Sequence, residues 1–284
     1  MLKLQTWEEA QPSRKALRKD TFEGHITDII ATHQERRSGE QAFLVEQDPH
    51  WVTPTHYHLE QQFQVIMAGH GTIGRHDVTP LCVHYAAPET AYGPIVAGPD
   101  GVSYLTLRMS GDTSAWYLHK PGSRERMQPG LKREQQHGAP EGRVSADALA
   151  SLARASVEVL IAPRPDGLAA HLLRIAPGQV YPGSNESGDP LEPLEPAEPF
   201  EPLEPAEPAD TSKPAHAGRY YVITQGSVSL GGQRAEARSV AFASADENVT
   251  LQAGPQGAEV VVLQFPVQAL APIMTPIASA TLES

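Results

Sequence analysis

Cysteine is almost absent from this chain of 284 residues, because Cys82 is the only one. A single thiol cannot form an intramolecular disulfide, and it cannot supply the cysteine pairs of a structural zinc site. Since disulfides are rare in reducing compartments, the lack of cysteine pairs is consistent with a cytoplasmic protein, which is the localisation we expect.

Long apolar runs and excess positive charge are also lacking. The sequence has no run of eighteen apolar residues that could span a membrane, and the stretch from Met1 to Glu9 lacks the apolar core of a signal peptide. The formal net charge is −12 and the pI is near 5.4. These values argue against nucleic acid or an anionic membrane as a partner.

A pair of histidines, His56 and His58, is the most informative feature that is present. Successive side chains of a β-strand point to opposite faces, so two residues spaced by one point to the same face. Both imidazoles could then reach one metal ion. The alternative is a pair of ordinary, half-exposed strand histidines, because short motifs often match by chance.

Residues 41–110 contain short β-rich runs separated by Pro, Gly, Asp and His, a pattern typical of an antiparallel sandwich or barrel. The runs are Phe43–Gln47, Gln62–Met67, Gly71–Ile73, Leu81–Ala86 and Val102–Met109. After them, residues 119–143 are polar and rich in Gly and Pro, which indicates an exposed linker. Residues 145–154 then predict one short helix, with Ser145 as its N-cap.

The second half of the chain repeats the first, which indicates an internal duplication. The matches are Pro49, Val52 and Pro54 with Pro177, Val180 and Pro182, at an offset of 128; residues 65–69 with 222–226, at 157; and residues 97–101 with 253–257, at 156. The jump between offsets places an insertion at about 187–215 in the second copy. Its tract from Leu191 to Ala209 repeats Glu-Pro-x, which predicts an extended polyproline II arm.

The first half resembles the cupin superfamily, whose first motif is His-x-His, three or four residues, Glu, six residues and Gly. His56, His58 and Gly69 match this motif, and Gln62 stands at the position of the Glu. The second cupin motif is a Pro/Gly-rich turn that ends in His. It corresponds to residues 87–92, with Tyr92 in place of the His.

The resemblance implies an all-β protein with two double-stranded β-helix barrels, which are jelly rolls, joined by a linker with a short helix. The expected parts are an N-terminal arm and metal-binding barrel at 1–120, a linker at 121–156, and a second, degenerate barrel at 157–284 that carries the insertion. We expect the second barrel to be structural or an interface partner, because it has lost the site residues. Ser184 and Glu186 replace the histidines, Arg219 replaces Gln62, and Val249 or Asn248 replaces Tyr92.

The resemblance also implies a divalent metal ion held by His56, His58 and Gln62. The neutral Gln62 leaves the ion its full charge, and Tyr92 in place of His leaves coordination positions open. Tyr92 is a candidate acid or base, a hydrogen-bonding neighbour or a barrel-filling aromatic. Glu60 is the rival ligand. His84 is either a core histidine or part of the site. Tyr104 and Arg108 are an even number of residues apart on one strand, so either both line the pocket or both face water.

These features favour a metal-dependent bicupin enzyme of the dioxygenase type that acts on a small anionic or enolisable molecule. Iron(II) is the favoured metal, and manganese, nickel, copper and zinc are the others considered. The alternatives are a small-ligand sensor without enzyme activity and a metal-free isomerase that uses a histidine base. A homodimer is compatible with the sequence.

Overall fold

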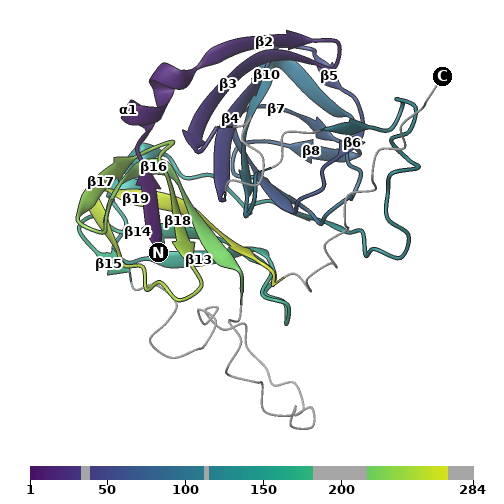
Figure 1. The fold of residues 1–284 in the computed structure, drawn as a ribbon. Helices are drawn as coiled ribbons and strands as arrows, with labels where there is room; N and C mark the ends of the chain where they lie inside the picture. The colour runs from purple at the N-terminus through teal and green to yellow at the C-terminus, as the bar shows by residue number, and fades with distance from the viewer. Residues whose placement is uncertain (33–38, 112–114, 182–215, 268–284) are drawn as a thin grey trace, which may run out of the picture.

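The computed structural model describes residues 1–32, 39–111, 115–181 and 216–267, and it contains two β-barrels that pack against each other (Figure 1). Among these residues, no helix is long and apolar enough to cross a membrane. The insertion at 187–215 and its Glu-Pro tract lie outside the described residues, as do Ser184 and Glu186. The all-β architecture that the sequence predicts is confirmed.

The first barrel is a nine-stranded antiparallel sheet with the order β12-β9-β7-β10-β4-β3-β2, in which β5 pairs with β10 and β8 with β7. A separate two-stranded sheet joins β6 and β11. The strands are β2 (Lys15–Lys19), β3 (Phe22–Ile30), β4 (Gln41–Gln47), β5 (Val52–Thr53), β6 (His56–Tyr57), β7 (Gln62–Ile73), β8 (His76–Val78), β9 (Val83–Ala86), β10 (Ile95–Arg108), β11 (Trp116–Tyr117) and β12 (Gln135–Gly138).

The second barrel is an eight-stranded sheet with the order β1-β18-β16-β19-β14-β13, in which β15 pairs with β19 and β17 with β16. Its strands are β1 (Leu2–Gln5), β13 (Ser156–Ile161), β14 (Ala169–Ile175), β15 (Val180–Tyr181), β16 (Gly218–Leu230), β17 (Gln233–Glu236), β18 (Val240–Ser244) and β19 (Leu251–Phe265). The helices are α1 (Trp7–Ala10), the 3-10 turn η1 (Gln11–Ser13) and α2 (Ala146–Ala150).

The two sheets share one topology, as an internal duplication requires. The order β9-β7-β10-β4-β3 in the first barrel corresponds to β18-β16-β19-β14-β13 in the second. Equivalent glycines mark the same bend: Gly69 and Gly226 both have positive φ. A Cβ atom at either position would lie about 2 Å from the carbonyl oxygen of Gly101 or Gly257, so only glycine fits there.

Each barrel receives an edge strand from the segment that precedes the other barrel. Strand β1, at the start of the chain, pairs with β18 of the second barrel, and β12, in the linker, pairs with β9 of the first. Figure 1 shows the N-terminal strand lying against the second barrel. Residues 119–143, which contain β12, are therefore not only the exposed linker that their composition suggested. The predicted domain bounds stay a prediction.

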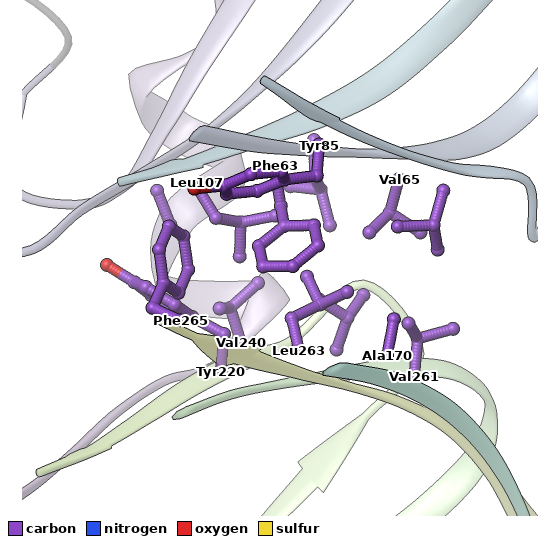
Figure 2. Packing of buried hydrophobic residues seen from close by; sticks show 14 of the residues in the cluster. Phe63, Val65, Tyr85, Leu107, Ala170, Tyr220, Val240, Val261, Leu263 and Phe265 are labelled. Atoms are coloured by element: carbon purple, nitrogen blue, oxygen red, sulfur yellow. The ribbon is translucent and has the colours of Figure 1, made fainter. Parts of the chain in front are cut away.

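Strand alternation divides the apolar residues into a layer between the barrels and two barrel interiors. On β7, Phe63 and Val65 belong to the cluster between the barrels, whereas Ile66 belongs to the interior of the first barrel. The layer between the barrels is continuous, and side chains from the two facing sheets interdigitate in it (Figure 2). The rings of Phe63 and Phe265 meet there edge to face, with their centroids 4.8 Å apart.

A hydrogen bond also joins the barrels. The fully buried Tyr220, on β16, donates its hydroxyl to the backbone carbonyl of Arg108 at 2.7 Å. The same hydroxyl lies 3.2 Å from the backbone carbonyl of Gln41. The second barrel therefore holds the ends of the two first-barrel strands, β4 and β10, that carry these residues.

The short linker helix is confirmed in a shorter form, α2, and its predicted N-cap is correct. The Ser145 hydroxyl accepts a hydrogen bond from the Ala148 amide at 3.1 Å. Strands β1, β2 and β3 lie in the first thirty residues, where no strand was predicted from the sequence.

The shared layer should dominate the stability of the chain. Phe265→Ala should lower the free energy of unfolding by about 3–5 kcal/mol, because it opens a cavity between the two sheets. The matched control is Val267→Ala, two residues away at a side chain that is 43% exposed, which should change it by less than about 0.5 kcal/mol. Urea unfolding of both variants is the measurement, and equal losses would show that the layer is not a shared core.

Candidate functional site

Side chains of the first barrel that point away from the shared layer gather as a polar cluster at one end of its interior. Strands β7 and β10 pair so that Gln62 lies directly opposite Arg108. Directly opposed residues of antiparallel strands place their side chains on the same face of the sheet. Both residues are almost completely buried, and so is Tyr104, four residues before Arg108 on the same strand. Of the two options that the sequence left open for Tyr104 and Arg108, the structure shows the interior one.

His56, His58 and Tyr92 join this cluster from neighbouring segments. The backbones of His56 and Tyr92 exchange two hydrogen bonds, of 2.9 and 3.1 Å, which hold the two side chains next to each other. The ring centroids of His56 and His58 are 5.3 Å apart. The intervening Tyr57 bonds instead to the Ser123 carbonyl in the linker. The expected placement of the two imidazoles on one face is therefore observed.

The hydrogen-bond directions in the cluster follow from its chemistry. Arginine only donates, so the 3.0 and 3.1 Å contacts from Arg108 fix the carbonyl oxygen of Gln62 as their acceptor. The amide nitrogen of Gln62 then donates to the Tyr92 hydroxyl at 2.5 Å. Tyr92 in turn donates to Nε2 of His56 at 3.0 Å. Nδ1 of His56 completes the chain by donating to the Pro54 carbonyl at 2.7 Å.

His56 is therefore a neutral imidazole that carries its proton on Nδ1 and accepts through Nε2. Burial lowers the pKa of His56 to about 3, with a smaller contribution from the nearby His58, whereas the bond to Pro54 acts in the opposite direction. The nitrogen that accepts from Tyr92 is thus the one that could bind a metal ion.

Arg108 brings a permanent positive charge into the cluster. Besides its bonds to Gln62, its guanidinium donates to the side-chain oxygen of Gln41 at 3.1 Å and lies 3.2 Å from Nδ1 of His58. It also lies over the ring of Phe43, 5.5 Å from the centroid. Arg108 could be inferred from the sequence only through its even spacing from Tyr104, and no sequence signal pointed to Gln41, which enters the cluster from β4.

The donors fit a divalent ion in part. Two imidazoles and an adjacent phenol oxygen are suitable ligands for such an ion. The oxygen of Gln62, which the sequence predicts as the third ligand, already accepts two hydrogen bonds from Arg108. Among the described residues, no three His, Cys, Asp or Glu side chains form a metal-binding group. If an ion binds here, His56 and His58 would hold it, with Gln62 or Tyr92 as the oxygen ligand. Glu60, which is half-buried, stays the alternative ligand.

His84 lies inside the barrel beside the cluster. Its ring centroid is 4.9 Å from that of Tyr92, and its two nitrogens lie 2.8 Å and 3.2 Å from side-chain oxygens of Gln64 and Gln135. Burial lowers the pKa of His84 to about 3, with a further contribution from His137. The sequence did not identify Gln64, Gln135 or His137 as neighbours of the site. His50 and His70 are exposed, whereas His76 is half-buried and its ring stacks on that of His137.

Because His84 is neutral in the folded chain, the stability of the protein should depend on pH. Because its pKa is lower in the folded chain than in the unfolded chain, the unfolded chain takes up the proton first as the pH falls. The free energy of unfolding should therefore decrease below about pH 6.5, the ordinary pKa of histidine. The slope of the unfolding free energy against pH is proportional to the number of protons taken up on unfolding. His84→Gln should reduce that number by up to about one, whereas His50→Asn, at an exposed site, should leave it unchanged. The measurement is urea unfolding at several values between about pH 4 and about pH 7, with a chelator present. Equal slopes of free energy against pH in wild type and His84→Gln would contradict the prediction.

Comparisons with known proteins show similarity only at the level of three-dimensional structure. No family model matches the chain, and no curated protein matches it. Similar solved structures include a candidate dioxygenase from Nostoc punctiforme, with 11% identity, a TM-score of 0.52, and 96% of this chain and 81% of that chain covered. An oxalate decarboxylase from Lactobacillus farciminis, in complex with formate, has 13% identity and a TM-score of 0.52 over 93% and 87%.

An oxalate decarboxylase from Bacillus subtilis with Mn(II) centres has 13% identity and a TM-score of 0.50 over 92% of this chain and 77% of that chain. All three are cupin folds, and the matches extend over most of both barrels of this chain. The chain therefore has the bicupin fold that its sequence predicts.

Proposed function

We propose that the first barrel is the active site of a metal-dependent enzyme that acts on a small carboxylate-bearing or enolisable molecule. The observation that carries the proposal is the convergence of His56, His58, Gln62 and Tyr92 on one polar cluster inside the barrel. These are the four residues that the two motifs single out. A cluster of buried polar and titratable groups in a barrel interior is the usual setting of a cupin-like ligand site.

The residues of the cluster suggest separate roles. His56 and His58 would hold the ion, which when bound would polarise a substrate oxygen as a Lewis acid and, if redox-active, would support oxidation. Arg108 supplies fixed positive charge inside the barrel, which favours an anionic substrate. The Tyr92 hydroxyl, between His56 and Gln62, is placed to give or take a proton at a substrate oxygen.

The reaction class is proposed from the resemblance in fold. A dioxygenase-type oxidation and a decarboxylation are the two reactions to test first, because the similar structures include a candidate dioxygenase and oxalate decarboxylases. Iron(II) remains the favoured metal for the first reaction. Manganese(II) gains support from the centres named for the Bacillus subtilis enzyme. Fold alone does not determine function, so these reactions are starting points.

A specific observation favours a second candidate, metal-free proton transfer. Arg108 already bonds to the oxygen of Gln62, and Tyr92 already donates to Nε2 of His56. A guanidinium near the proposed ligands also lowers their affinity for a cation. In this version His56 is the base and Arg108 stabilises an enolate, as an isomerase requires.

Metal content distinguishes the two candidates. The purified protein, reconstituted with iron(II) or manganese(II), should hold one ion per chain, because the described residues bring the two motif imidazoles together only in the first barrel. His56→Ala and His58→Ala should each lower the affinity at least about tenfold, since each removes one of two imidazole ligands. Elemental analysis after dialysis is the measurement, and His50→Asn is the control.

Turnover is then measured on the same samples with small keto acids, diketones and dicarboxylates, as oxygen uptake, carbon dioxide release and incorporation of solvent deuterium into the substrate, which reports isomerase-type proton transfer. Activity that requires the metal and is lost in His58→Ala but kept in His50→Asn supports the metal-dependent enzyme. Activity that persists without metal would replace it with the isomerase, and tight binding of such a compound without turnover would replace it with a sensor.

A further inference from the structure

The second barrel carries a buried arginine at the position that Gln62 occupies in the first. Arg219 lies on β16, directly opposite Gln264 on β19, and its Nε donates to the Gln264 oxygen at 2.9 Å. In the first barrel the same pair of strands carries Gln62 and Arg108. The duplication has therefore kept an arginine–glutamine pair at the same end of both barrels, with the two residues exchanged between the strands.

Within the described residues, no carboxylate comes within ion-pair distance of Arg219. The contrast is with Arg174 on β14 of the same barrel, whose guanidinium is bound by Glu158 at 2.9 Å and by Glu259 at 3.1 Å. Arg219 is only 7% exposed. A guanidinium that is buried without a counter-charge costs free energy, so an anionic ligand at this position would offset that cost.

Two histidines lie near this guanidinium. His216 is 3% exposed, and its Nδ1 has no hydrogen-bond partner in the part of the chain that the structure describes. Burial and, to a smaller extent, the positive charge of Arg219 together lower the pKa of His216 to about 4. The same two causes lower the pKa of His171, on β14. Both imidazoles are therefore neutral at neutral pH, so each can donate one N–H group to an anion.

The strand register places His171, Arg219 and Gln264 on one face of the sheet. His171 lies opposite Val262, which is two residues from Gln264 on β19, and Gln264 lies opposite Arg219. Val262 belongs to the interior cluster of the second barrel, so this face is the barrel interior. Tyr221 is the next inward residue of β16. Burial raises the pKa of Tyr221, and the nearby charge of Arg219 counteracts part of that rise.

We propose that the second barrel contains its own binding site for a small carboxylate, formed by Arg219 and His216, with His171 beside them and Gln264 positioning the guanidinium. The planar guanidinium pairs with both oxygens of a carboxylate, and Nδ1 of His216 supplies a further hydrogen bond. One fixed charge and neutral imidazoles suit a carboxylate better than a phosphate dianion. This site needs no metal and does not depend on the function proposed for the first barrel.

The test is titration of the full-length, chelator-treated protein with acetate, malonate and inorganic phosphate. The imidazole 15N resonances of His216, assigned with His216→Gln, report on this site separately from the first barrel. We expect saturable shifts with acetate or malonate. Arg219→Gln should weaken the binding at least about tenfold, because the variant loses a charge-assisted pair. The charge-matched control is Arg234→Gln, whose side chain is 64% exposed and pairs with Glu236; it should bind as wild type does.

A thermal melt of ligand-free Arg219→Gln shows whether weaker binding by this variant comes from the lost guanidinium or from a loss of folding. A buried charge without a counter-ion is not a stabilising group, so the midpoint should stay at or above that of wild type. His216 resonances that move with neither carboxylate would overturn the proposal. Tighter binding of phosphate would overturn the carboxylate assignment, and a large fall in the midpoint would show that Arg219 is a structural ion-pair partner.

Discussion

The apolar layer between the two barrels is the constraint on which the rest of the structure depends. One face of each sheet packs against the other sheet, through residues such as Phe63 and Leu107 from the first barrel and Leu263 and Phe265 from the second. Because a strand alternates its side chains, the residues between these positions must point into their own barrel. The shared layer therefore determines which residues are available for chemistry.

The polar clusters of both barrels follow from this alternation. Phe63 faces the second barrel, so its neighbours Gln62 and Gln64 face the interior of the first. Leu107 faces the second barrel, so Arg108 faces the interior. Tyr220 on β16 faces the first barrel and bonds to the backbone of Arg108, so its neighbour Arg219 faces the interior of the second. One interface thus orients an arginine–glutamine pair in each barrel.

The sequence was informative where the residues of a feature lie close together in the chain. His56, His58 and Gly69 could be identified because they lie within one short stretch of chain, from β6 to the bend in β7. The close approach of Gly101 to Gly69 explains why glycine is required there. The duplication was visible because the strands are repeated at nearly constant offsets.

Features that depend on strand register could not be predicted in the same way. The hydrogen bond between Arg108 and Gln62 joins residues 46 positions apart. It engages the Gln62 oxygen that the motif assigned to the metal. Likewise, Leu2 and Leu4 show the alternation of a strand, but nothing local shows that β1 pairs with the sheet of the second barrel. The matched positions of the second copy contain no histidine, and His171 and His216 lie elsewhere in the sequence.

The central claim is that the first barrel holds a divalent ion between His56 and His58. A crystal structure of protein reconstituted with manganese(II) or iron(II), with anomalous data collected at the metal edge, tests it most directly. The account predicts one anomalous peak in bonding contact with Nε2 of His56 and with the His58 ring, with the Tyr92 hydroxyl displaced from its bond to His56. An interior without a peak, in which Tyr92 still donates to His56 and Arg108 still bonds to Gln62, would contradict it.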